Sequence, residues 1–178
     1  MDALAKLSTV VFDKTGTLTH GSFEVEAVHP DTIDEKELLH LAAHVERFST
    51  HPIAVALRNA YPNEADSCVV TDTKEIAGQG ITAVINGKTV SVGNDKMMAT
   101  LGIKPHACKL CAHHTGTTVH VAIDGQYAGH ILIADQLKDD ARKAIEQLKR
   151  LGVQRTVMLT GDRDEAARQV AEQTGVTE

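Results

Sequence analysis

The chain has 178 residues, of which 42% are hydrophobic, 24% are charged and only 3% are aromatic, and its formal net charge is −6. This composition is typical of a soluble globular protein with one or two small domains and an aliphatic core. The acidic balance argues against nucleic acid as the main partner. No run of 18 apolar residues predicts a membrane span, and no secretory pattern is present at the N-terminus. The three cysteines, an odd number, fit a reducing cytosol better than a disulfide framework.

The first third of the chain reads as a strand followed by two helices. Residues 8–12 form a short apolar run that leads into a polar turn, which indicates a buried strand. Apolar residues at helical spacing predict a helix within 31–48, which should end near residues 48–52. Pro52 suits the first turn of a second helix over 52–60.

The middle of the chain has the pattern of an antiparallel sheet. Residues 67–76 are strand-like, and two further pairs of alternating runs are separated by Asn86-Gly87 and by Asp124-Gly125. Both dipeptides suit a type I′ hairpin turn. The region 21–131 is therefore expected to be an antiparallel sheet with accompanying helices.

The last third returns to alternating helices and strands. A helix that ends at Gly152 should present an apolar face. The expected members of that face are Leu137, Ala141, Ile145, Leu148 and Leu151. A second apolar strand, 156–160, precedes a polar turn and a helix that ends at Gly175. Because ligands bind at the carboxyl ends of strands in open α/β sheets, Asp13 and the Thr160-Gly161-Asp162 turn are expected to meet at one site.

The seven residues from Asp13, DKTGTLT, resemble the phosphorylation motif of the P-type ATPases, which share a haloacid-dehalogenase-like core. A lone aspartate in such a turn would more often be a cap. The resemblance implies that Asp13 is the nucleophile that accepts a phosphoryl group, that Lys14 offsets charge, and that Asp13 and the Thr15 carbonyl hold Mg²⁺. Carboxylate attack on phosphorus and charge neutralisation by Mg²⁺ are the chemistry that such transfer needs.

Thr15 occupies the position at which phosphatases with a similar core carry a second aspartate. A threonine hydroxyl cannot act as a general base near neutral pH. The phosphoenzyme is therefore expected not to hydrolyse promptly, which suits a pump better than a phosphatase. In the second motif, LTGD, the resemblance implies that Thr160 and the Gly161 amide hold phosphate oxygens at a helix N-terminus and that Asp162 lies near the nucleotide phosphate or Mg²⁺.

A third motif, STHP, resembles the Ser-x-His-Pro motif of the heavy-metal-pumping subgroup. The resemblance implies that His51 lies near adenine and that Glu46 contacts the base. An imidazole can stack on a purine, and a carboxylate can accept a hydrogen bond from its exocyclic amine. The further residues expected to line the ATP site are Gly78, Gly80, Gly93 and Asn94.

The resemblance implies an α/β fold: an incomplete Rossmann-like, haloacid-dehalogenase-type core with an inserted α+β nucleotide-binding domain built on an antiparallel sheet. The expected parts are the first piece of the phosphorylation domain (1–20), the nucleotide-binding insertion (21–131) and a truncated second piece of the phosphorylation domain (132–178). ATP and Mg²⁺ are the expected ligands. Hinges near 19–21 and 131–135 would bring the nucleotide to Asp13.

The family's later Gly-Asp-Gly-x-Asn-Asp string and its actuator and transmembrane domains have no counterpart in this sequence. The chain is therefore expected to be the cytosolic part of a heavy-metal exporter at the cytoplasmic face of a cell membrane. The actuator and transmembrane domains would be its partners, and the chain alone should bind ATP but turn over little or not at all. The sequence around Asp13 and Thr160 looks closer to zinc, cadmium and lead pumps than to copper pumps.

Two alternatives stay open. One is a soluble phosphatase or phosphotransferase of the same core fold, which Thr15 disfavours. The other is a metal-binding module in the stretch HACKLCAHH, with Cys108, Cys111, His113 and His114 as ligands. That spacing can hold Zn²⁺, although such a stretch is more often a polar loop.

Overall fold

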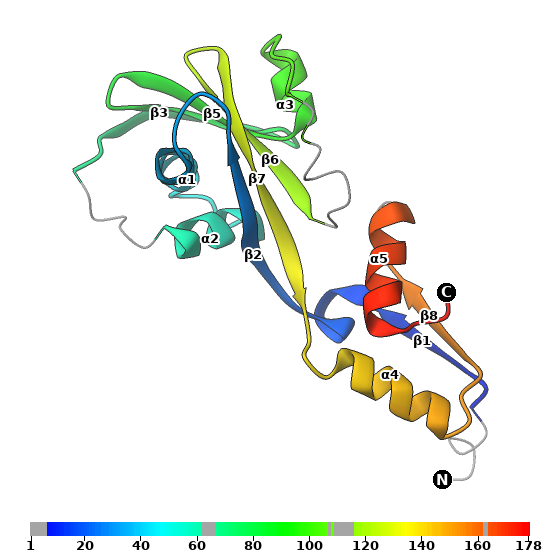
Figure 1. Cartoon of the computed structure of the whole chain (residues 1–178). Coiled ribbons are helices and arrows are strands. Elements are labelled where there is room, and N and C mark those ends of the chain that lie inside the picture. Colours follow the sequence, from blue (N-terminus) through cyan, green and yellow to red (C-terminus); the bar gives the residue numbers. More distant parts are fainter. Residues whose placement is uncertain (1–6, 62–66, 107, 109–115, 162–163) are drawn as a thin grey trace. The chain divides into compact units, whose positions relative to one another are not determined.

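The computed structural model describes residues 7–61, 67–106, 108, 116–161 and 164–178, except for the side chains of 164–166 (Figure 1). These residues divide into two structural units. The first contains the described residues up to Ser22 and from Asp135 onward, and the second contains those from Phe23 to Ala134. The chain passes between the units along β2 (Thr19–Pro30) and β7 (Gln126–Leu137).

The first unit is built around a parallel strand pair. Strands β1 (Thr9–Asp13) and β8 (Arg155–Leu159) pair in register, with α4 (Ala141–Arg150) before β8 and α5 (Asp164–Thr174) after it. Apolar side chains of these elements form a separate core, whose buried members are Leu18, Ala141, Ile145, Met158, Val170 and Val176. The predicted strands 8–12 and 156–160 are confirmed with shifts of one residue.

The predicted apolar face of the helix before Gly152 is wrong at both of its ends. Leu137 is the last residue of β7, and α4 begins only at Ala141. Leu151 follows the helix and its surface is 81% exposed. The helical period extends past the true bounds because a one-dimensional pattern does not reveal where a strand ends.

Among the described residues, six strands form the sheet of the second unit, in the order β2-β7-β6-β5-β4-β3. The remaining strands are β3 (Val70–Ile76), β4 (Gly80–Ile85), β5 (Lys88–Gly93) and β6 (Thr117–Ile123). Neighbours from β3 to β7 are antiparallel. This confirms the predicted mixed α/β fold with an antiparallel sheet in the middle of the chain.

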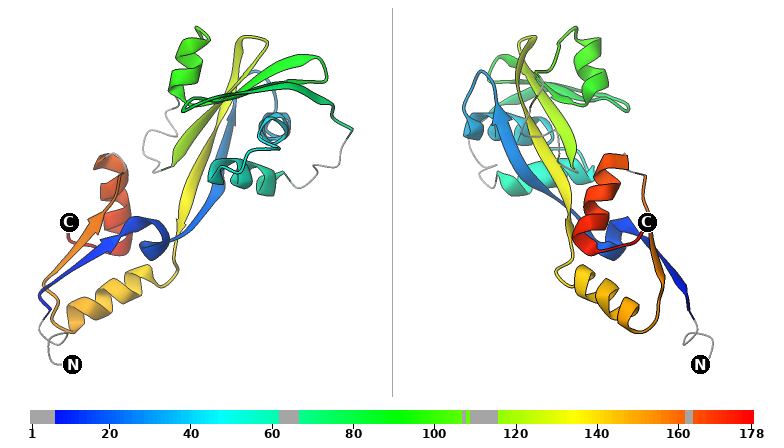
Figure 2. Two further views of the ribbon diagram at one scale, coloured as in Figure 1. Left: turned by 180° about the vertical axis from the view of Figure 1, so that it is seen from behind. Right: turned by 45° about the vertical axis from the view of Figure 1, so that its right-hand side comes forward.

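The two faces of this sheet are covered by different helices (Figure 2). Helices α1 (Glu35–Val45) and α2 (Pro52–Ala60) bury Leu38 and Leu57 against one face, where the strands contribute alternate residues such as Val119 and Val121. The short α3 (Asp95–Thr100) packs on the other face, where Met97 and Met98 meet Ala122 and Tyr127. The alternation of a strand thus assigns one set of side chains to each layer.

Both predicted hairpin turns are present. Asn86 and Gly87 have φ values of 48° and 85°, and Asp124 and Gly125 have 49° and 78°. Positive φ at both central residues is the requirement of a type I′ turn.

Two boundaries differ from the sequence prediction. The first helix ends at Val45, so Phe48 lies beyond it and is 75% exposed. Residues 19–30 form a long strand although their sequence pattern is mixed. Of the described helices, none combines the length and the hydropathy that crossing a bilayer requires.

Candidate functional site

The first candidate site lies at the carboxyl end of the parallel strand pair. Asp13 ends β1 and is paired with Leu159 of β8, so that Thr160 and Gly161 follow at the same end of the neighbouring strand. Asp13 is exposed, as a nucleophile must be. Asp162 lies outside the described residues. The register therefore brings Asp13 and the start of the second motif to one edge of the first unit.

A buried threonine holds the turn that follows Asp13. The Thr19 hydroxyl accepts a hydrogen bond from the Gly16 amide at 3.1 Å and lies 2.5 Å from Asp135 Oδ2 and 3.0 Å from the Lys14 carbonyl oxygen. The Lys138 ammonium donates to the Gly16 carbonyl at 3.2 Å. The sequence prediction placed Thr19 and Asp135 only within the two expected hinges and gave Lys138 no role. Thr19 could have been noticed as the last residue of the DKTGTLT motif.

The same turn presents oxygen atoms of the kind that Mg²⁺ binds. Thr15 leaves helical geometry, with φ −72° and ψ 124°, and Gly16 takes the left-handed conformation with φ 75°. Thr15 is exposed, as Asp13 is. Carboxylate and carbonyl oxygens are the ligands of hard divalent cations, so this pair fits the predicted Mg²⁺ ligands.

The second candidate site is a cavity of about 330 Å³ in the second unit. All six residues predicted to contact the nucleotide line it: Glu46, His51, Gly78, Gly80, Gly93 and Asn94. They come from the α1–α2 connection, the β3–β4 turn, β4, and the β5–α3 junction. Sequence reasoning missed several polar residues of the wall, among them Glu75, Gln79, Thr117 and Thr118. The cavity is within the usual size of small-molecule sites.

The corner between α1 and α2 is fixed by its own hydrogen bonds. The Arg58 guanidinium donates to the carbonyl oxygens of Glu46 and Ser49 at 2.7 and 2.8 Å. His51 is the N-cap of α2, and its Nδ1 accepts from the Ile53 amide at 3.3 Å. Because Nδ1 is an acceptor, the proton of the neutral ring lies on Nε2. The exposed His51 ring is thereby held in one orientation.

Glu46 is a buried carboxyl group, only 8% exposed. Burial raises its pKa, and the nearby charge of Glu75 adds to this, whereas the Ser49 hydrogen bond and the Arg58 charge act in the opposite direction. The Ser49 hydrogen bond and the Arg58 charge do not fully offset the burial, so the ionised form of Glu46 is destabilised. Groups with such shifts concentrate at functional sites.

Two of the cavity glycines are required by close packing of the strands. Gly80 of β4 faces Gly93 of β5, and a Cβ on Gly80 would lie 2.1 Å from the Val92 carbonyl oxygen. A Cβ on Gly93 would lie 2.4 Å from the Gln79 carbonyl oxygen. Gly78 differs, because a Cβ there would meet nothing within 4 Å. Of the three predicted glycines that line the cavity, Gly78 is therefore the one whose missing side chain leaves open space for a ligand.

The Asn94 side chain links two parts of the cavity wall, the start of α3 and the β3–β4 turn, by hydrogen bonds. Its Oδ1 caps α3 by accepting from the amides of Lys96 and Met97 at 3.0 and 3.2 Å. Its Nδ2 donates to the Gly78 carbonyl oxygen at 2.9 Å. Both ends of the side chain are thus engaged by the protein, and Asn94 positions the Gly78 turn.

The chain matches the model of the haloacid dehalogenase-like hydrolases over residues 7–178 and belongs to that family. It is 49% identical over 177 residues to a zinc-transporting ATPase of Synechocystis sp., covering 99% of this chain and 24% of the relative. It is 38% identical over 176 residues to a copper-exporting P-type ATPase of Staphylococcus haemolyticus, covering 96% of this chain and 22% of the relative. The chain thus spans about a quarter of the length of these curated relatives.

Solved structures agree with the sequence relatives. A zinc-transporting PIB-type ATPase in its E2.Pi state matches with a TM-score of 0.77 and 37% identity, over 97% of this chain and 29% of that one. The catalytic domain of the CPx-ATPase CopB-B, studied upon nucleotide binding, matches with a TM-score of 0.73 and 26% identity, over 99% of this chain and 62% of that one. The resemblance to heavy-metal P-type ATPases inferred from the motifs is confirmed.

Proposed function

We propose that this chain is the ATP-binding and phosphorylation region of a heavy-metal cation-exporting P-type ATPase. The observation that carries the proposal is the convergence of six residues, expected on the nucleotide from motifs alone, on one cavity of the second unit. Asp13 supplies the acceptor carboxylate in the first unit, at the strand end where the family places its nucleophile.

The cavity suits the nucleoside part of ATP better than its phosphates. Glu46 and Glu75 line it, and the described lining residues include no lysine or arginine. A triphosphate would be repelled by these carboxylates, whereas the adenine amine can donate a hydrogen bond to Glu46. The His51 ring offers a face for stacking. The open space at Gly78 leaves room for the ribose and the chain of phosphates to leave the cavity.

The proposed chemistry is transfer of the γ-phosphoryl group to Asp13. A carboxylate oxygen of Asp13 attacks the γ-phosphorus, the bond from this phosphorus to the β,γ-bridging oxygen breaks, and ADP leaves with that oxygen. Lys14 offsets negative charge at the transferred group. Mg²⁺, held by Asp13 and the Thr15 carbonyl oxygen, would neutralise charge on the phosphate oxygens. Because Asp13 and the cavity belong to different units, transfer requires hinge motion along the strands that join them.

Thr15 gives this phosphoenzyme a long lifetime. Its hydroxyl cannot activate water as a carboxylate base would. A persistent aspartyl-phosphate suits a pump that changes conformation before dephosphorylation. In the complete pump the actuator domain would promote that later step, and the transmembrane domain would carry the ion, with this chain on the cytoplasmic side.

Zinc or cadmium is the proposed cargo class, in preference to copper. The support is the higher identity to a zinc-transporting relative, 49%, than to a copper-exporting one, 38%. Selectivity itself would be set by ion ligands in the membrane domain.

The test is a calorimetric titration of the chain with ATP, with and without Mg²⁺, for the wild type and His51→Gln. We expect saturable one-site binding that needs little Mg²⁺ and that weakens at least about tenfold in the variant, a loss of about 1.4 kcal/mol. Asp13→Asn is the matched control and should leave this affinity nearly unchanged. Absence of ATP binding by a folded chain would refute the proposal.

A further inference from the structure

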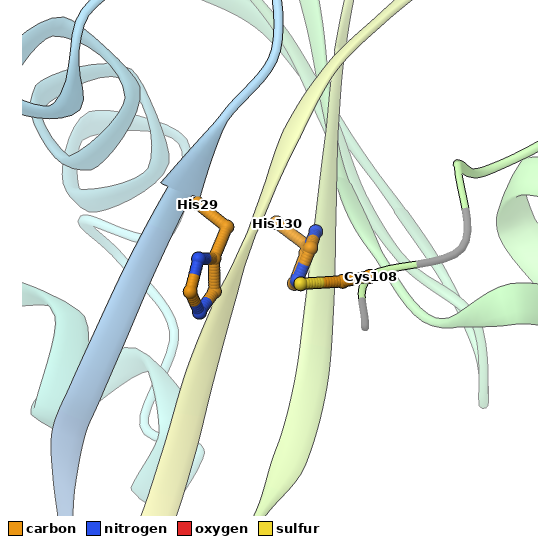
Figure 3. A group of neighbouring side chains, drawn as sticks. All are labelled: His29, Cys108 and His130. Carbon is orange, nitrogen blue, oxygen red and sulfur yellow. The ribbon is translucent and has the colours of Figure 1, made fainter. Parts of the chain in front are cut away.

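Three side chains with metal-binding atoms converge in the second unit (Figure 3), and none of them is among the residues that line the 330 Å³ cavity. His29 comes from β2, His130 from β7, and Cys108 from the segment after α3. One ring nitrogen of each histidine and the cysteine sulfur all lie within 4.8 Å of one another. Ligand atoms of a tetrahedral zinc site are about 3.4 Å apart, so side-chain rotations that bring these atoms closer by at most about 1.4 Å would close the site.

His29 has an unsatisfied nitrogen. Its Nε2 is buried and has no hydrogen-bond partner within the described part of the chain. A buried polar atom without a partner costs about 1–3 kcal/mol, and such an atom in a folded protein calls for an explanation, for example a bound ion. The His29 and His130 rings are neighbours, with centroids 5.0 Å apart. An ion bound in the plane of the His29 ring at Nε2 would give this nitrogen a partner.

A chain of hydrogen bonds orients His130. Its Nδ1 lies 3.2 Å from the Tyr127 hydroxyl, which lies 3.0 Å from His120 Nδ1, and His120 Nε2 lies 3.0 Å from Asp95 Oδ1. The Asp95 carboxylate only accepts, so neutral His120 carries its proton on Nε2 and accepts the tyrosine proton on Nδ1. Tyr127 then accepts from His130 Nδ1. The lone pair of His130 is therefore on Nε2, which is the arrangement of a metal ligand whose other nitrogen is hydrogen-bonded.

The chain of hydrogen bonds described above requires His120 and His130 to be neutral, and the local environment of both side chains favours that state. Burial lowers the pKa of His120, although Asp95 acts in the opposite direction. Burial, with the neighbouring His29 and His120, lowers the pKa of His130 to about 4.

The backbone around the three side chains is held in place. A Cβ on Gly129 would lie 2.5 Å from the His29 carbonyl oxygen, so the glycine allows β7 to approach β2 beside the cluster. The Asp31 amide donates to the Ala128 carbonyl oxygen at 2.9 Å. His106 Nδ1 lies 2.9 Å from Asp31 Oδ1, which ties the segment of Cys108 to the end of β2.

We propose that His29, Cys108 and His130 form a binding site for a borderline-soft divalent cation of the Zn²⁺ or Cd²⁺ type. Two imidazoles and one thiolate are ligands that such ions prefer over Mg²⁺ or Ca²⁺. This site shares only Cys108 with the Cys108, Cys111, His113 and His114 set predicted from sequence, whose other three members lie outside the described residues. It stands on its own geometry and does not depend on ATP binding.

The test is a titration of the reduced, chelator-treated chain with Zn²⁺ by calorimetry, and with Co²⁺ by absorption spectroscopy. We expect one tight site that shows a thiolate-to-cobalt charge-transfer band. Cys108→Ser should abolish that band. His29→Gln and His130→Gln each remove a ligand, so each should weaken Zn²⁺ binding by at least the roughly 10–100-fold that loss of a second-shell partner costs.

Matched controls come from a second His/Cys group in the same unit, His40, His44 and Cys68. There His40 Nε2 already lies 3.1 Å from Cys68 Sγ and Nδ1 lies 3.3 Å from Glu37 Oε2. Cys68→Ser and the surface variant His20→Gln should leave the tight site unchanged. The proposal is overturned if His29→Gln and His130→Gln, shown by circular dichroism to be folded, bind Zn²⁺ as the wild type does. Loss of the cobalt band in Cys68→Ser and not in Cys108→Ser would overturn it equally.

Discussion

The Thr19 hydroxyl lies 2.5 Å from the Asp135 carboxylate across 116 residues of sequence. It joins the turn after the proposed nucleophile to the point where the chain re-enters the first unit. The hydroxyl also accepts the Gly16 amide proton, so one buried group holds both sides of this turn. Asp135 Oδ1 is buried and lacks a hydrogen-bond partner within the described residues, which makes the Thr19 bond to Oδ2 more important.

Replacing Thr19 with valine removes this hydroxyl at nearly constant volume. We expect Thr19→Val to lower the free energy of unfolding by about 1–3 kcal/mol, because the partly buried Asp135 carboxyl group and the Gly16 amide lose their partner. The measurement is urea denaturation followed by far-ultraviolet circular dichroism. Thr17→Val, at an exposed position of the same motif, is the control and should change stability by less than about 0.5 kcal/mol. Equal stabilities of the two variants would show that the bond contributes nothing.

Alanine substitution can distinguish the packing role of Gly80 from the ligand-contact role proposed for Gly78. We expect Gly80→Ala to destabilise the fold by at least about 1–3 kcal/mol, since its Cβ would overlap the Val92 carbonyl and φ is 150°. Gly78→Ala has open space and only the strain of its φ of 70°, about 1 kcal/mol. It should therefore stay folded and lose ATP affinity. Thermal unfolding and ATP titration of both variants provide the check, and a folded Gly78→Ala with unchanged affinity would remove Gly78 from the ligand surface.

The sequence predicted many of the local elements, for identifiable reasons, and the residues expected on the nucleotide line one cavity, although their contact with a nucleotide stays a prediction. The Asn86-Gly87 and Asp124-Gly125 pairs require positive φ at both positions, and that requirement can be read without tertiary contacts. The cavity residues carry short motifs whose types suit a nucleotide. Strand β2 was missed although its middle part, FEVEAV, alternates apolar and polar residues as a strand does. The polar and glycine residues of THGS before that part interrupt the pattern, and only the folded sheet shows that they continue the same strand.

Long-range partners could not be predicted in the same way. Nothing in the sequence near Asp135 indicates a bond to Thr19, because the pairing exists only after β7 has brought the chain back. The cluster of His29, Cys108 and His130 has the same origin. The spacing around Cys108 drew attention to neighbours in sequence, whereas the described partners come from two strands that are adjacent only in the folded sheet.

We expect the ionised Glu46 carboxylate to lower the stability of the fold and, at the same time, to strengthen ATP binding. Burial raises its pKa, so the folded state favours the protonated form and the ionised form is destabilising. The protonated carboxyl group therefore contributes to stability in full below the pKa of the unfolded state, and this contribution is lost as the pH rises through the higher pKa of the folded state. Glu46→Gln should therefore be more stable than the wild type at pH 7, and this advantage should shrink toward pH 4. Calorimetric melting at several pH values measures it.

The same variant should bind ATP more weakly at pH 7, because an amide offers the adenine amine a weaker acceptor than a carboxylate. Glu35→Gln, an exposed residue in the first turn of α1, is the matched control for both measurements. A Glu46→Gln chain that is less stable than the wild type at pH 7 would mean that the carboxylate is fully compensated by Ser49 and Arg58.

Asn94 allows a test of positioning against direct contact. Asn94→Asp keeps the oxygen that caps α3 and loses the donor to the Gly78 carbonyl, whereas Asn94→Ala loses both. We expect Asn94→Ala to lose about 0.5–2 kcal/mol of stability through the cap and Asn94→Asp to lose less. If Asn94 acts by positioning the Gly78 turn, both variants should lose ATP affinity to a similar degree despite their different stabilities. Unchanged ATP affinity in Asn94→Asp would contradict this role, since the turn would then hold its shape without the Nδ2 bond.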